Sequence, residues 1–383
     1  MNTKIPMPAE AEPSVVHNAR RVDAMRQVLH THQVRESMML AQQPCLRNAA
    51  LAGFQAAATA AVALPIVLLS PWPHLIGFAS LGALVALFGR FAPRASRGRV
   101  LILCAFWQTF AVLVMSLATW LGASPAIELL VLAVCSGLFS FVSVSGQFGP
   151  PGPLIFVFAA GASMGPVDSG SAVVERAIAT ASVALIAFAV CALTEVLRQL
   201  PVDGSSIAAE PRRPVAHRVI SAIRVALGAA VAALSAHALG AAHPAWAAIG
   251  AVAVIQGTHL HISMNRALQR TTGTIIGAVV VWIVLAHDPS VWTIVALLAA
   301  LQFATEIVIG FNYALGQIFV TPMALLMSQL AAPHASGLGM VPERVLDTLL
   351  GAGIGVVLAI LCSTLDDRRY LADHHATRAA RQS

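Results

Sequence analysis

Apolar residues along this chain gather into long, nearly unbroken stretches, separated by short breaks that contain proline, glycine or arginine. The stretches are about 20 residues long, the length that a helix needs to cross roughly 30 Å of hydrocarbon. The pattern therefore predicts an all-α polytopic membrane bundle of twelve transmembrane helices. The expected spans are residues 48–69, 74–89, 100–121, 126–143, 151–166, 172–197, 219–241, 243–258, 268–286, 290–309, 311–330 and 342–363.

Composition agrees with this pattern. Of the 383 residues, 58% are hydrophobic and 10% are charged, whereas a soluble domain carries roughly a quarter charged residues. A water-soluble fold of this composition would have no place for its apolar surface. The first 45 residues are polar, with no apolar core before a small-residue cleavage site, so we expect no cleavable signal peptide.

The net charge of +6 could indicate nucleic-acid binding, but the distribution of the basic residues argues against it. With the N-terminus inside, all 23 Lys and Arg residues except Arg176 and Arg344 lie in cytoplasmic segments or at the cytoplasmic ends of spans. This is the positive-inside rule. The charge therefore predicts that both termini are cytoplasmic and that nucleic acid is not a partner.

The chain also resembles itself. Three matches relate its halves: LGALVALFG (81–89) with IGAVAVIQG (249–257), VVERAIAT (173–180) with VPERVLDT (341–348), and Gly146-Gln147 with Gly316-Gln317. The first two have an offset of 168 residues and the third an offset of 170. Three matches in order at one spacing predict an internal repeat.

Each half contains an even number of expected spans, so the two copies enter the membrane from the same face and form a parallel repeat. Such repeats commonly hold a site between the halves, near mid-membrane. The expected division is a cytoplasmic N-terminal segment (1–46), a first six-helix repeat (47–197), a linker (198–218), a second six-helix repeat (219–363) and a cytoplasmic tail (364–383).

Four motifs in the second half carry a family resemblance. They are HPAWAAIGAVAVIQG (243–257), RALQRTTGTIIGAVV (266–280), FNYALGQIFVTPMALL (311–326) and ERVLDTLLGAGIG (343–355). Together they resemble the fusaric acid resistance and aromatic acid exporter family of bacterial inner-membrane proteins. The resemblance covers about residues 219–363 and, through the repeat, extends more weakly over 47–197. It implies a location in the inner membrane and transport of aromatic acids.

Glu306 lies inside an apolar span, near its cytoplasmic end. A carboxylate there costs a few kcal/mol on insertion scales. One hypothesis is that Glu306 takes up and releases a proton to couple export to the proton gradient. The alternatives are that the side chain reaches the membrane interface or pairs with an arginine of a cytoplasmic loop.

Glu343, Arg344 and Asp347 begin the last expected span and can share one helix face. The favoured interpretation is a local ion pair that the helix start tolerates. The alternative is that Arg344, or its repeat counterpart Arg176, attracts an organic anion while Asp347 titrates. Asp347 is replaced by Ala179 in the first copy.

Arg270 stands at a predicted cytoplasmic helix start, where a cation and free N–H groups could bind an anion. The positive-inside rule explains it equally simply, and we favour that interpretation. His243 and Trp246 lie at the outer end of a span, where an aromatic ring and a polar tip suit the interface. For this pair anchoring is favoured over stacking on a substrate.

Asn312 and Tyr313 open an expected helix in which Thr321-Pro322 lies within the membrane. A kink that lines a cavity and simple packing are equal alternatives for this segment. The five cysteines show no metal-ligand spacing, and His237, His259 and His261 have no acidic or Cys companions at ligand spacing. No catalytic motif is present, so we expect no enzyme, no cofactor and no metal site.

These observations predict a secondary transporter that exports small organic, aromatic acids, with proton exchange as the energy source. A passive organic-anion channel and a non-transporting membrane scaffold are the alternatives. The expected partners are membrane lipid and a small organic anion, with a periplasmic adaptor protein and a homodimer as further options.

Overall fold

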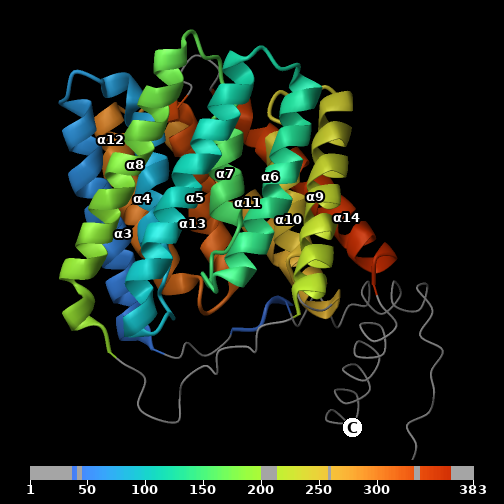
Figure 1. Ribbon diagram of the computed structural model, residues 1–383, viewed down its shortest axis with the longest axis horizontal. Coiled ribbons are helices and arrows are strands. Elements are labelled where there is room, and N and C mark those ends of the chain that lie inside the picture. Colours follow the sequence, from blue (N-terminus) through green and yellow to red (C-terminus); the bar gives the residue numbers. More distant parts are fainter. Residues whose placement is uncertain (1–36, 41–44, 200–213, 258–259, 332–336, 364–383) are drawn as a thin grey trace, which may run out of the picture.

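The computed structural model describes residues 37–40, 45–199, 214–257, 260–331 and 337–363, and within them the regular structure is wholly helical (Figure 1). Residues 1–36 and 41–44 of the expected N-terminal segment, residues 200–213 of the linker and the tail after residue 363 lie outside the described residues.

Nine helices in the described part of the chain are long and apolar enough to cross a bilayer. They are α3 (Leu46–Leu68), α5 (Arg94–Trp120), α6 (Pro125–Ser145), α8 (Gly170–Leu193), α9 (Val215–Ala238), α11 (Leu260–Leu285), α12 (Val291–Val308), α13 (Tyr313–Ala331) and α14 (Met340–Leu361). Each coincides with one of the expected spans. The chain is therefore a multi-pass membrane protein.

The other three expected spans, 74–89, 151–166 and 243–258, correspond to short helices. The first is a continuous run of η1 (Pro73–Leu75), α4 (Ile76–Ala83) and η2 (Leu84–Leu87), the second is α7 (Leu154–Ala162), and the third is α10 (Ala245–Ile255). The shortness of α7 follows from the sequence before it, Gly149-Pro150-Pro151-Gly152-Pro153, because proline removes backbone donors and the two glycines have φ near +70°. Nine of the twelve expected spans are thus long helices in the described part of the chain, and the other three correspond to helices shorter than a full span, so the count of twelve stays a prediction.

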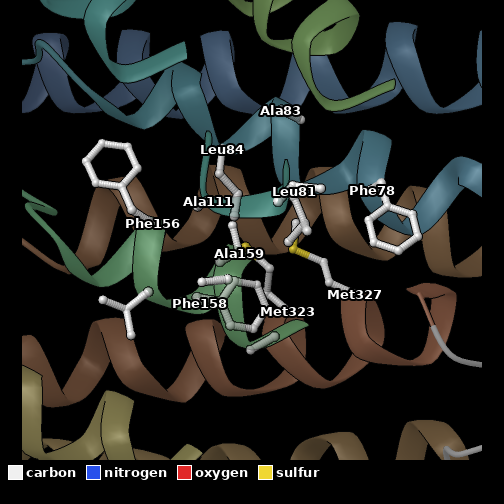
Figure 2. Close-up of a cluster of buried hydrophobic side chains, with 14 of the residues drawn as sticks. Phe78, Leu81, Ala83, Leu84, Ala111, Phe156, Phe158, Ala159, Met323 and Met327 are labelled. Atoms are coloured by element: carbon white, nitrogen blue, oxygen red, sulfur yellow. The ribbon is translucent and has the colours of Figure 1, made fainter. Parts of the chain in front are cut away.

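The short helices lie at the centre of the bundle. Every residue of α4 is buried, as are the residues of α10 from Ala245 to Val254. Figure 2 shows this centre, where Leu81 of α4 lies beside Met327 of α13, with Phe78 at one side of the cluster and Phe156 of α7 at the other. By contrast, the long helices expose large apolar side chains, including Phe54, Ile102, Leu185 and Trp282, on their outer faces. That outer surface suits lipid.

Helices from the two halves of the chain interleave. The helix α6 packs along α9 and α12 packs along α3, so each half contributes a helix to the other side of the bundle (Figure 1). Within the halves the packing is alike: α4 contacts α8 as α10 contacts α14, and α5 contacts α7 and α8 as α11 contacts α13 and α14. The start of α3, the end of α8, the start of α9 and the end of α14 all lie at the lower end of the bundle in Figure 1.

Candidate functional site

The candidate site is built around Arg344, in the second turn of α14. Its side chain is 2% exposed, and its guanidinium carbon lies 5.2 Å from the centre of the Trp246 ring at the start of α10. The Nε and Nη1 atoms are buried without a hydrogen-bond partner. A buried cation that leaves donors unpaired is costly unless an anion compensates it.

A second arginine lies close by. Arg270 is on α11, is 2% exposed, and donates from Nη1 to the hydroxyl of Tyr313 over 3.1 Å. Its Nε is also buried and unpartnered. Arg270, Asp347 and Tyr313 are near enough to Arg344 to act on its charge. Three helices, α11, α13 and α14, therefore bring two guanidinium groups together in the interior of the bundle.

Among the residues that the structure describes, Asp347 is the carboxylate that acts on the charge of Arg344, and it is only partly engaged. Asp347 is 4% exposed, and its Oδ2 atom is buried with no hydrogen-bond partner. Arg270 and Arg344 thus carry two positive charges against the single negative charge of Asp347. The arrangement has one positive charge in excess and donors to spare, which suits a small anion.

Glu343, which neighbours Arg344 in the sequence, is used elsewhere. Its Oε1 accepts from the backbone N–H of His243 over 2.8 Å, and its Oε2 lies 2.7 Å from Nδ1 of the same histidine. His243 in turn stacks on Trp246 with ring centres 4.5 Å apart. Glu343 therefore holds His243 against Trp246, and Trp246 supports the Arg344 guanidinium.

These contacts correct two expectations. Arg344 forms no ion pair with Glu343 or Asp347, although all three are described, so the favoured local ion pair at the helix start is wrong. Trp246 is 6% exposed and packed between polar neighbours, so it is not a residue of the lipid interface. Both expectations failed because helix periodicity cannot show that the start of α10 packs on the start of α14.

The position of Arg270 also differs from the expectation. The helix α11 begins at Leu260 and not near residue 268, so Arg270 lies well inside it and its surroundings are side chains of other helices. The helix-start interpretation of this residue is therefore wrong. At α13 the expectation is confirmed, because the helix begins at Tyr313 and the Asn312 side chain accepts from the backbone N–H of Ala314 over 2.7 Å.

The first half of the chain repeats part of this arrangement, around the half-buried Arg176. The Arg176 guanidinium lies 4.6 Å from the ring centre of Phe78, and His74 lies 3.7 Å from Glu175. The difference is at the guanidinium itself. Arg176 donates to two backbone carbonyls, that of Gly165 over 3.2 Å and that of Pro166. The protein's own backbone therefore satisfies Arg176, whereas Arg344 is left open.

Glu306, near the end of α12, pairs with an arginine, which was one of the alternatives considered for it. Its carboxylate lies 3.3 Å from Nη1 of Arg90, which also donates to the backbone carbonyl of Glu306 over 3.1 Å. Both side chains are less than a tenth exposed. The pair joins the segment between η2 and α5 to α12, and thus the first half of the chain to the second.

Sequence reasoning missed several polar groups of the interior. Gln302 on α12, Thr274 on α11 and Gln317 on α13 have buried side-chain atoms without hydrogen-bond partners. The same holds for Thr321 of α13, which the sequence did single out. Thr321 does not donate to the backbone carbonyl that Pro322 leaves without a donor. The available signal was an amide side chain inside an apolar span, which Gln302 and Gln317 both show.

Residues 228–358 match the family model described as fusaric acid resistance protein-like. An uncharacterized membrane protein, YvaC, from Bacillus subtilis (strain 168) is 32% identical over 143 residues, which is 37% of this chain and 23% of that protein. The match thus spans about a quarter of the relative's length. No solved structure matches the chain. The part of the chain that holds Arg270, Tyr313, Arg344 and Asp347 is therefore similar to fusaric acid resistance proteins.

Proposed function

We propose that this protein exports small organic anions, carboxylates in particular, and that the transported anion binds between Arg344 and Arg270. The observation that carries the proposal is the pair of buried guanidinium groups with unpartnered N–H donors. A carboxylate matches such donors in charge and geometry, because its two oxygens can each accept from a guanidinium.

The family description supports an organic acid as the substrate class. Fusaric acid resistance is the property that the matching family model names, and the matched residues 228–358 include the whole Arg344 site. We therefore propose aromatic carboxylic acids as the first compounds to test. The closed counterpart at Arg176 supports the choice of a carboxylate, because two carbonyl oxygens occupy that guanidinium.

We also propose that the helices form two parallel six-helix repeats, each including short helices that complete the crossing together with neighbouring loops. The matching contacts of α4 with α8 and of α10 with α14 support this arrangement. The shared pairing of an arginine with an aromatic ring, Arg176 with Phe78 and Arg344 with Trp246, supports it independently. The distribution of Lys and Arg supports an inner-membrane orientation with both termini in the cytoplasm.

Proton exchange is the energy source that we propose for export. Glu306 suits this role because uptake of a proton by its carboxylate would remove the charge that holds Arg90. Since that pair joins the two halves of the chain, protonation at Glu306 would loosen a contact across the bundle. Binding of the anion and binding of the proton would then occur at separate places.

Flux in reconstituted vesicles tests the proposal. The full chain is reconstituted into liposomes, and movement of radiolabelled benzoate is measured with and without an imposed pH gradient. Accumulation that depends on the gradient is the expected result. Equilibration without accumulation would instead indicate a passive channel, and no movement of any aromatic acid tested would indicate a scaffold and refute the proposal.

A variant pair tests the site. Arg344→Gln removes a charge whose hydrogen bonds to an anion contribute about 1.5–3 kcal/mol, so we expect benzoate flux at low concentration to fall at least roughly tenfold. The matched control is Arg176→Gln, the same change at the closed position of the first half. Its flux, normalised to folded protein, is expected to stay within about twofold of the unchanged chain. Equal losses in both variants would contradict the assignment of Arg344.

A further inference from the structure

We infer that Asp347 is a tethered counter-anion that competes with the transported anion for Arg344 and so sets the affinity of the site. This inference rests on the proposed function. It adds a residue that determines affinity and release, and it predicts that removing a charged group strengthens binding.

The geometry of α14 places the two groups together. Arg344 and Asp347 are three residues apart on one helix, both are at most 4% exposed, and each acts on the charge of the other. Several of their polar atoms have no hydrogen-bond partner. These atoms are Nε and Nη1 of Arg344 and Oδ2 of Asp347. The two side chains are therefore free to approach each other or to admit a third group.

Other charged groups do not take the place of Asp347. The groups that act on Asp347 are Glu343, Arg344 and His243, and Glu343 and His243 are bound to each other. Arg270, from α11, faces the same site and adds positive charge. In the empty protein Asp347 is thus the carboxylate that offsets Arg344.

The first half of the chain supports this role by contrast. There the equivalent arginine, Arg176, is satisfied by the carbonyls of Gly165 and Pro166, and the position of Asp347 holds Ala179. A carboxylate one turn along the same helix accompanies the arginine only in the second half, whereas the acid that acts on the charge of Arg176 is Asp168, from the loop before α8. If Asp347 served to stabilise the start of α14, the closed copy would have the same need.

The energetic consequence follows from electrostatics. An anion that binds Arg344 must lie near the negative charge of Asp347, and like charges repel strongly in a poorly solvated interior. The repulsion weakens binding, and it also speeds release, because the Asp347 carboxylate can replace the departing anion beside Arg344. Without this competitor the anion would bind more tightly and leave more slowly.

Equilibrium binding tests the inference. Labelled benzoate is titrated onto the full chain in nanodiscs, and flux in vesicles is measured in parallel. For Asp347→Asn we expect Kd to fall at least about tenfold, equivalent to removing roughly 1.4 kcal/mol of repulsion. We also expect KM and the maximal flux to fall together, because release limits turnover. A purely structural role would instead weaken binding and lower the unfolding temperature.

A matched variant and the unchanged chain separate the possible failures. Ala179→Asp, the matched change in the first half, is expected to leave benzoate affinity unchanged, because the Arg176 donors are already occupied. If the unchanged chain binds benzoate and Asp347→Asn binds it no more tightly, the inference is overturned while the proposed function stands. If the unchanged chain neither binds nor transports any aromatic carboxylate tested, both are overturned.

Discussion

At the scale of single residues, the buried arginines of this protein fall into two kinds. Arg97 pairs with Glu195 and donates to Gln55 over 2.7 Å, and Arg198 donates to the same glutamate over 2.9 Å. These cations are neutralised by fixed partners. Arg344 and Arg270 are equally buried and, among the residues that the structure describes, have no carboxylate within ion-pair distance. Unpartnered Nε atoms occur in both kinds, since the Nε of Arg97 has no partner either, so the difference lies in the charge that faces each guanidinium. The difference separates a cluster that stabilises the fold from one that is arranged to receive a ligand.

The cluster of Glu195 with Arg97 and Arg198 predicts the effect of a substitution on thermal stability. Glu195→Ala leaves Arg97 and Arg198 without their shared carboxylate, and breaking a buried ion pair by removing one partner costs roughly 3–5 kcal/mol. We expect a clear fall in the unfolding temperature, measured by thermal denaturation in detergent. The control is Glu175→Ala, since Glu175 and His74 form an exposed pair. A Glu195→Ala protein as stable as the control would show that the cluster contributes little.

The identity of the site residues was readable from the sequence, whereas their partners were not. Arg344, Asp347 and Arg270 stand out as charges inside apolar stretches. Whether the polar atoms of these side chains have partners depends on residues that are far away in the chain. The pairing of Arg90 with Glu306 joins residues 216 positions apart, and neither hydropathy nor local spacing carries that information. The contrast between Arg176 and Arg344 likewise appears only in three dimensions.

At the scale of helices, glycine positions decide how closely the central pairs pack. A Cβ atom at Gly351 of α14 would stand 2.1 Å from the backbone oxygen of Ala247 on α10, far inside contact distance. Two residues further on, a Cβ at Gly353 would meet nothing within 4 Å. The same helix therefore has one glycine required by close approach and one that packing does not require.

This pair gives a matched test of helix packing. Gly351→Ala forces α10 and α14 apart, because the obstructing atom is backbone and cannot turn away, and we expect lower thermal stability and weaker benzoate binding. Gly353→Ala should be neutral or stabilising by up to about 1 kcal/mol, since alanine favours the helix. Thermal denaturation in detergent measures both. Equal stability of the two variants would contradict the close packing of α10 on α14.

Helix positions were predictable because apolar length is a local property of the sequence, and each long helix overlaps an expected span. The lengths of the helices were harder to predict from the sequence than their positions. A hydropathy window counts the apolar residues around Gly149-Pro150-Pro151-Gly152-Pro153 and extends the span, although these residues cannot continue a helix. The start of α11 was missed for the opposite reason, because its first turns contain polar residues, of which Ser263 is 4% exposed and lies against the protein interior.

At the scale of the whole molecule, the two halves hold each other through exchanged helices. Since α6 packs on α9 and α12 packs on α3, a movement of one half must displace a helix that is packed into the other. The buried pair of Arg90 with Glu306 lies at such a contact, because α12 carries Glu306 and the first half carries Arg90. A change of charge at this pair would therefore be felt on both sides of the bundle.

The last prediction separates coupling from binding. In Glu306→Gln the side chain keeps its shape but cannot exchange a proton, so export would lose its link to the gradient while the Arg344 site remains intact. We expect gradient-driven accumulation of benzoate in vesicles to fall to the level without a gradient, and exchange of labelled for unlabelled benzoate to continue at a comparable rate. Glu128→Gln, at a buried acid of α6, serves as the control and should keep both activities. Accumulation that persists in Glu306→Gln would place proton coupling at another residue. Loss of both exchange and accumulation would mean that the pair of Arg90 with Glu306 is needed for movement of the two halves and does not carry the proton.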